Sequence, residues 1–201
     1  MRMDRSVIYR GLYQDLKNAF GREEADILWA LSDAALEYLY KKYQKQDTYS
    51  TAGMIFPPAA VYMALRKRHP DYPAMELLEN YGTKTGWKMY RLIHGFSSVP
   101  GMSEFIWKHV NQIMYRTSSE KLGYIRKIRS EAGETAAVDI LRCPYYEMAK
   151  TIRMPQICHV ICYMDKVYMN GFKQIRYTRT KSVAEGGDCC DYQLSWDENK
   201  K

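Results

Sequence analysis

The chain has 201 residues, of which 46% are hydrophobic and 26% are charged. A globular chain of this length buries a core without disulfides or structural metals, so disordered, collagen-like and low-complexity architectures are excluded. The net charge of +7 is spread along the sequence rather than concentrated on one face. This distribution argues against nucleic acid as a partner and suits an anionic small molecule at least as well.

The sequence predicts a cytoplasmic protein with no membrane partner. Charged residues such as Asp4 and Arg5 interrupt any apolar N-terminal run, so no export signal is expected. The longest uncharged stretch, residues 54–65, is too short to span a bilayer and contains Pro57 and Pro58. In a reducing compartment the cysteines are expected to be free thiols.

The first 120 residues are predicted to be mostly helical, because apolar residues recur every three or four positions. Gly21 is expected to end the first helix. Pro57 and Pro58 suit the first turn of the third helix, so residues 48–56 are expected to form a loop. Gly82 and Gly86 weaken the helical pattern in the middle of the fourth. The five expected helices cover residues 6–20, 22–40, 59–68, 73–93 and 102–115.

After Gly123 the pattern changes to short strands and two helices. A turn at residues 130–134 is expected to join the first two strands as a hairpin. This order predicts an α+β fold, with a helical N-terminal layer packed with an antiparallel sheet of about four strands. We expect a single domain over residues 1–201, mostly helical over 1–120 and sheet-containing over 121–198. The expected strands cover residues 124–129, 136–142, 173–183 and 189–196, and the helices cover 144–152 and 156–170.

All five cysteines lie after residue 142. In the helix over 156–170, Cys158, Cys162 and Asp165 follow one another at spacings of four and three, so they form one stripe beside the apolar face. A thiol one turn from a carboxylate suits nucleophilic and acid–base chemistry. The alternative is that the cysteines pack as small hydrophobic residues and Asp165 touches solvent. In the last strand, alternation directs Cys190 inward and Cys189 outward.

No metal and no other cofactor is expected. Neither Cys158 with Cys162 nor Cys189 with Cys190 has the spacing of a zinc-binding pair, although Cys143, Cys162 and Cys190 could converge as three thiolates. The sequence also lacks a phosphate loop, a dinucleotide fingerprint and a Gly-x-Ser-x-Gly elbow. Nucleotide-driven and Ser-His-Asp chemistry are therefore not expected.

The segment Gly186-Gly187-Asp188 precedes the last strand. It has two interpretations. Glycine and aspartate are typical of a simple turn. Alternatively, glycines let a ligand approach the backbone and let N–H groups hold an anion.

Three segments together carry a motif: residues 142–147 (RCPYYE), 162–165 (CYMD) and 179–192 (RTKSVAEGGDCCDY). Over about residues 138–196 this pattern resembles the L-2-amino-thiazoline-4-carboxylic acid hydrolase family. Ser182 stands where threonine is more usual in the pattern, Tyr192 where phenylalanine is more usual, and Cys189 is an additional thiol.

The resemblance implies a hydrolase that uses water to open a cyclic amidine ring bearing a carboxylate, by breaking a non-peptide C–N bond. It implies Cys162 or Cys190 as the nucleophile and Asp165 as the acid–base partner. The implied partner is a small-molecule substrate with a carboxylate. Whether the protein also forms a homo-oligomer is left open. The substrate-binding residues implied are Cys143, Arg142 or Arg179 for the carboxylate, and Gly186, Gly187 and Asp188 in a loop that closes over the substrate.

Two other function classes stay open. A more distant likeness to vinyl-4-reductase-type domains implies a non-catalytic small-molecule-binding or sensor module. A pocket shared by Asp165 and at least two of Cys143, Cys162 and Cys190 favours the hydrolase, whereas a wholly apolar pocket without them favours the sensor. A structural or partner-binding protein would instead have no pocket and an exposed apolar patch.

Overall fold

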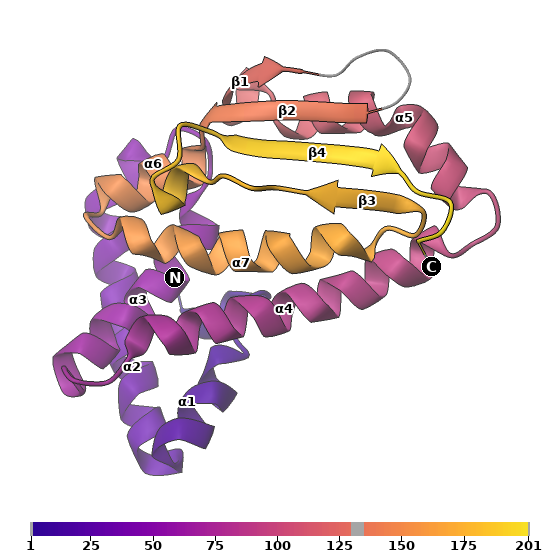
Figure 1. The fold of residues 1–201 in the computed structure, drawn as a ribbon. Coiled ribbons are helices and arrows are strands. Elements are labelled where there is room, and N and C mark those ends of the chain that lie inside the picture. The colour runs from indigo at the N-terminus through magenta and orange to yellow at the C-terminus, as the bar shows by residue number, and fades with distance from the viewer. Residues whose placement is uncertain (1, 130–134, 201) are drawn as a thin grey trace.

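The computed structural model describes residues 2–129 and 135–200. Within that part of the chain it confirms the α+β fold, with seven α-helices, mostly N-terminal, and one four-stranded antiparallel sheet near the C-terminus (Figure 1). None of the described helices is long and apolar enough to cross a membrane.

Five helices precede the sheet. The first is shorter than expected, because residues 7–11 form turns and the helix begins only at Leu12. Gly21 ends it as predicted, at a φ of 81° that glycine adopts readily. The bounds are α1 Leu12–Phe20, α2 Arg22–Tyr43, α3 Ala52–Arg68, α4 Ala74–Ser97 and α5 Met102–Thr117.

Helix α3 corrects the loop expected over residues 48–56, because the helix already begins at Ala52 and holds Pro57 and Pro58 in its interior. The Asp47 carboxylate accepts hydrogen bonds from the N–H groups of Thr51 and Ala52, at 2.6 and 3.0 Å. These bonds satisfy N–H groups that have no partner within the helix. The helix therefore starts before the prolines, which are buried against the core.

Gly82 and Gly86 do not interrupt α4. They face α7, which spans Cys158–Tyr168. A Cβ atom on Gly82 would lie 2.4 Å from the carbonyl oxygen of Val160, and one on Gly86 would lie 2.8 Å from that of Met164. Glycine is therefore needed here for close helix packing rather than for a break.

The remaining elements build the sheet, whose strand order is β1-β2-β4-β3. β1 and β2 pair as an antiparallel hairpin, and the turn expected at 130–134 falls outside the described residues. The expected strand over 173–183 is too long. The strand ends at Thr178, and the backbone N–H groups of Thr180 and Lys181 donate to the Asp191 carboxylate. The bounds are β1 Ile125–Ile128, β2 Thr135–Arg142, α6 Pro144–Thr151, β3 Ile175–Thr178 and β4 Cys190–Trp196.

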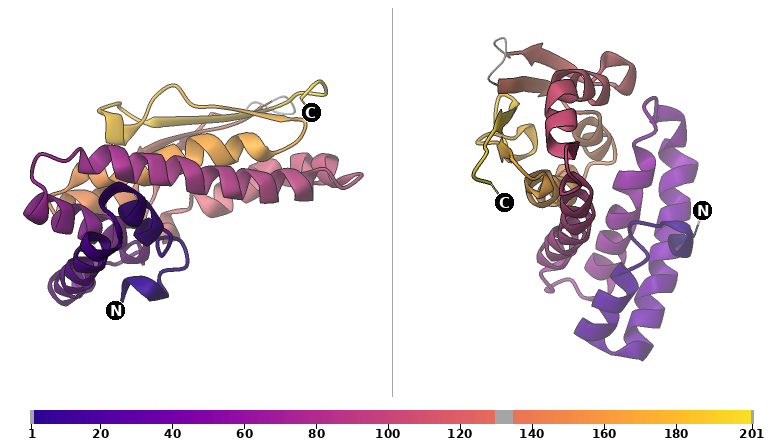
Figure 2. Two further views of the ribbon diagram at one scale, coloured as in Figure 1. Left: turned by 90° about the horizontal axis from the view of Figure 1, so that it is seen from below. Right: turned by 90° about the vertical axis from the view of Figure 1, so that its right-hand side faces the viewer.

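The helices lie on one side of the sheet (Figure 2). α5 packs against β2, and α7 lies between the sheet and the N-terminal helices, in close contact with α4. One hydrophobic cluster joins α1–α4 with α6 and α7, and a second joins α5 with the sheet.

Candidate functional site

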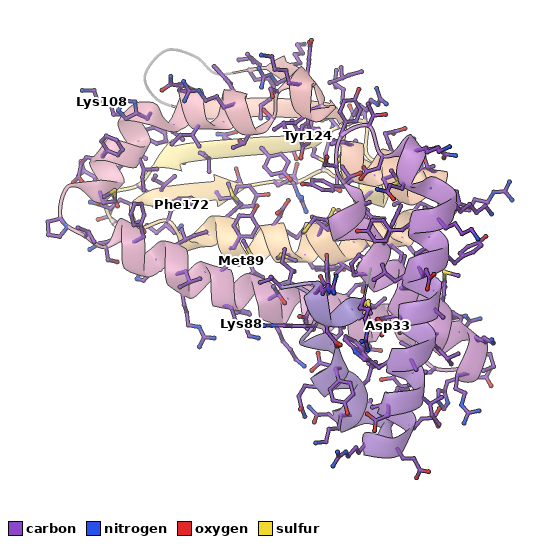
Figure 3. The ribbon with its side chains drawn as sticks, turned by 180° about the vertical axis from the view of Figure 1, so that it is seen from behind. Asp33, Lys88, Met89, Lys108, Tyr124 and Phe172 are labelled. Atoms are coloured by element: carbon purple, nitrogen blue, oxygen red, sulfur yellow. The ribbon has the colours of Figure 1, made fainter. Side chains whose placement is uncertain are left out.

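A cavity of about 600 Å³ lies between the sheet and helices α4, α5 and α7. Figure 3 shows Met89, Tyr124 and Phe172 around this space, whereas Lys108 points outward from α5. Most of the wall is apolar, because α5 and the sheet turn their hydrophobic faces toward each other. This apolar part includes Ile106, Val110, Ile113, Met114, Val138, Ile140, Ile175 and Leu194.

One wall of the cavity carries thiols and a carboxylate. Cys158, Cys162 and Asp165 lie along α7 at helical spacings of four and three, so all three line the cavity. Cys190 lines it from β4, and Cys143 lines it from the residue that precedes α6. The structure therefore brings Cys143, Cys162, Asp165 and Cys190 to one pocket.

A buried hydroxyl connects two of the thiols. The Oγ atom of Ser182 lies 3.9 Å from the Sγ atom of Cys162 and 3.9 Å from that of Cys190. The thiol of Cys190 donates to this oxygen, and the backbone N–H of Val183 donates to the Cys190 sulfur at 3.3 Å. Ser182 can therefore give its own proton to Cys162.

These surroundings separate the pKa values of the thiols. The hydrogen bond with Cys158 lowers the pKa of Cys162 to about 7; the positive charge of Arg179 and the Ser182 hydroxyl act in the same direction, against burial. Burial raises the pKa of Cys190 to about 11. The hydrogen bond between Cys158 and Cys143 raises the pKa of Cys158. The hydrogen bond with Cys158 also lowers the pKa of Cys143. Cys162 is therefore a better source of a thiolate near neutral pH than Cys158 or Cys190.

Asp165 is half-buried and lines the cavity. Burial raises the pKa of Asp165, although hydrogen bonds from Tyr168 and Tyr192 and the charge of Arg179 act against it. Tyr192 donates to Oδ2 of Asp165 at 3.1 Å. A buried carboxyl with a raised pKa keeps its proton longer and can donate it.

Arg179 lies directly behind this wall. Its guanidinium donates to the Tyr192 hydroxyl at 3.2 Å and to the backbone oxygen of Cys162 at 3.4 Å. The guanidinium carbon also lies 5.5 Å from the centre of the Tyr192 ring. These contacts join Arg179, Tyr192 and Asp165 into one chain beside Cys162.

The other residues proposed for substrate binding lie outside the cavity wall. Arg142 is exposed at the end of β2. Gly186, at a φ of 86°, ends a short 3-10 helix and is exposed, and Asp188 forms an exposed ion pair with Lys181 at 3.0 Å. The N–H of Gly187 donates to the Ser182 carbonyl at 2.8 Å. These contacts are those of a turn, while the neighbouring residues 183 and 184 line the cavity.

Sequence reasoning did not assign site roles to Ser182, Tyr192 and Cys158. Ser182 was distinguishable only as a departure from the family pattern. Tyr192 shares a strand face with Cys190, which was the available signal for its position. Cys189 does not line the cavity, as alternation predicted, but it is also only 6% exposed.

Among the described residues, no group of three or more His, Cys, Asp or Glu side chains is arranged to hold a metal ion. The polar wall offers thiol and carboxyl groups. What the arrangement can provide is a nucleophile at Cys162 and a proton donor at Asp165, one helical turn apart.

Comparison with known proteins gives one family. The model for L-2-amino-thiazoline-4-carboxylic acid hydrolase matches residues 48–194. No curated protein matches the chain. Among solved structures, the chain is similar to a crystal structure of an Fe(II) unliganded H-NOX protein mutant from K. algicida, at 13% sequence identity and a TM-score of 0.37. That alignment covers 96% of this chain and 97% of the other.

Proposed function

Because the chain belongs to the L-2-amino-thiazoline-4-carboxylic acid hydrolase family, we propose that it opens the ring of a cyclic amidine with water. The observation that carries this proposal is the polar wall of the cavity. There, Cys162, whose thiol has a lowered pKa, and Asp165, whose carboxyl has a raised pKa, line one pocket from adjacent turns of α7.

In the first half of the reaction, the Cys162 thiolate adds to the carbon of the cationic amidine. The ring C–N bond then breaks, and the departing nitrogen takes a proton from Asp165 and leaves as an amine. Covalent catalysis of this kind divides one difficult step into two easier ones. Arg179 acts as a positioning residue, because it holds the backbone of Cys162 and the hydroxyl of Tyr192.

In the second half, water adds to the same carbon and gives a proton to the Asp165 carboxylate. The C–S bond to Cys162 breaks, the thiolate is restored, and the carbon becomes a carbonyl. The hydroxyl group of the adduct releases its proton to solvent. This release balances the extra proton that the amidine carried as a cation. The net change is the addition of one water, with Asp165 returned to its protonated form.

The test is turnover of a panel of cyclic amidines, followed by mass spectrometry as the gain of one water. We expect Cys162→Ala and Asp165→Asn to lose at least about a hundredfold in rate, the scale of nucleophilic and acid–base contributions. Cys189→Ala is the matched control, since it removes a buried thiol that does not line the cavity. Wild-type rates in both of the first two variants would contradict the assignment.

The apolar part of the cavity favours one alternative, a small-molecule-binding or sensor module without catalysis. An apolar pocket with a few converging polar groups is also the usual form of a binding site. In that case the wild-type protein would bind amidines or related apolar ligands and release them unchanged. The turnover panel separates the two functions, because only the hydrolase produces a compound heavier by one water.

A further inference from the structure

The cavity is large for the ring that the family name describes. Its volume of about 600 Å³ corresponds to roughly twenty water volumes in the liquid and lies within the range that holds drug-sized ligands. A thiazoline ring with one carboxylate would fill only the part next to the polar wall. The remaining space reaches toward α5 and is bounded by apolar side chains such as Ile106 and Val110.

The charges of the wall also disfavour a carboxylate on the substrate. Among the described residues that line the cavity, none is Lys, Arg or His. A carboxylate buried there would have no cation beside it on the wall, and an unpaired buried charge is costly. Arg179 does not line the cavity. Its two terminal nitrogens donate to Tyr192 and to the backbone of Cys162, and its buried Nε has no hydrogen-bond partner among the described residues.

The mouth of the cavity is mostly apolar as well. Four described residues line the cavity and are also exposed to solvent: the polar Thr117 and three apolar residues, Ile8 at 37%, Phe96 at 57% and Ile113 at 46%. Exposed hydrophobic residues that cluster around an opening commonly mark a ligand-binding surface. A ligand that enters here passes apolar side chains before it reaches Cys162.

From these observations we infer that the substrate is a cyclic amidine that carries an apolar alkyl or aryl group in place of a carboxylate. This inference rests on the proposed hydrolase function for the ring chemistry. The cationic amidine lies against the Cys162 thiolate and the Asp165 carboxyl, and the apolar group extends along α5 toward Ile113. The recognition of the apolar group does not itself depend on catalysis.

The experiment compares two substrates that share one ring: 2-amino-thiazoline-4-carboxylate, and the same ring with an n-hexyl group instead of the carboxylate. Turnover is measured with the wild-type protein, and binding is measured by calorimetry with Cys162→Ala, which lacks the nucleophile. Because apolar burial strengthens binding, we expect the hexyl compound to bind at least about tenfold more tightly. Its kcat/KM should be higher by a similar factor.

Two variants of α5 test where the apolar group lies. Ile113→Lys places a charge on the cavity wall and should reduce binding of the hexyl compound about tenfold. Phe105→Lys is the matched control, because Phe105 is an exposed apolar residue of the same helix, at 59%, that does not line the cavity. Equal losses of affinity for the hexyl compound in both variants would overturn the placement of its apolar group along α5.

The outcomes separate this inference from the proposed function. Equal or better binding and turnover of the carboxylate compound would overturn the inference and leave the hydrolase function intact. Tight binding of the hexyl compound by Cys162→Ala, without turnover of either compound by the wild type, would support the apolar specificity and contradict the hydrolase.

Discussion

The hydroxyl oxygen of Ser182 lies 3.9 Å from the sulfur of Cys162, in the interior beside the cavity. The same oxygen lies 3.9 Å from the sulfur of Cys190, yet the two thiols differ in pKa, at about 7 and about 11. Ser182 lowers the pKa of both thiols; the difference comes from burial at Cys190 and from the Cys158 hydrogen bond and the Arg179 charge at Cys162.

Ser182→Ala should raise the pKa of Cys162, because the variant loses a donor to the thiolate. It should also cost about 1 kcal/mol of stability, the usual scale for a buried hydrogen bond. The pH midpoint of Cys162 alkylation, read by peptide mass spectrometry, measures the first effect. Ser182→Thr keeps the hydroxyl and serves as the control. An unchanged pH midpoint in Ser182→Ala would show that Ser182 does not lower the pKa of Cys162.

The two cavity thiols should differ in reactivity. Alkylation of Cys162 by iodoacetamide should rise with pH to half its maximum near 7, since the thiolate is the reactive form. Cys190 should stay unreactive up to about pH 10, because burial keeps it protonated. Peptide-resolved labelling over a pH series checks this. A common midpoint near 9 for both thiols would show that their surroundings do not distinguish them.

Asp165→Asn should become more stable relative to wild type as pH rises. In the native protein the pKa of Asp165 is raised from 3.8 by burial, so the folded state holds a proton that the unfolded chain has lost. Stability contributed by this group is full below pH 3.8 and falls as pH rises toward the native pKa. Asparagine has no such loss and can still accept from Tyr192. Thermal unfolding from pH 4 to pH 8 measures the difference in Tm.

The matched control for that series is Asp188→Asn. Asp188 is exposed, and its ion pair with Lys181 lowers its pKa, so its contribution has the opposite sign. The Tm difference for Asp188→Asn should therefore fall slightly as pH rises. A Tm difference for Asp165→Asn that also falls with pH would contradict the raised pKa.

Gly82→Ala should destabilise the protein, because the new Cβ would lie 2.4 Å from the backbone oxygen of Val160. Overpacking of this kind usually costs about 1–3 kcal/mol and occasionally more. Gly95→Ala, in the same helix but with nothing within 4 Å of its Cβ, should be stabilised by about 0.5–1 kcal/mol. The urea concentration at half unfolding, measured for both variants and the wild type, checks the prediction. Equal shifts of this midpoint in the two variants would refute it.

Local pattern predicted the elements of the fold better than their limits. The alternation of Cys190 and Leu194 and the stop at Gly21 are local properties, and the structure agrees with both. The pattern predicts Pro57 and Pro58 one turn too early in their helix, because the start of α3 depends on the Asp47 carboxylate. The local pattern treats Gly82 and Gly86 as a weakness in α4. It cannot show that glycine is needed there, because the atoms that require it belong to the backbone of α7, which is distant in sequence.

The candidate site was predictable in its chemistry and less so in its surroundings. Helical spacing placed Cys162 beside Asp165, since that relationship lies within one helix. Spacing could not show that Ser182 and Arg179 approach Cys162, because those contacts depend on how Asp191 holds the segment before β4. The apolar cavity was not predictable either, because α5 and the sheet form it together.

The most direct test of the central claim is a search for a covalent intermediate on Cys162. A slowly hydrolysed cyclic amidine is mixed with the wild-type protein, quenched in acid, and analysed by peptide mass spectrometry. We expect the ring-opened adduct on the peptide that contains Cys162, with Cys190 unmodified, and its decay should match product formation. Turnover without an adduct on Cys162, or undiminished turnover by Cys162→Ala, would contradict the account.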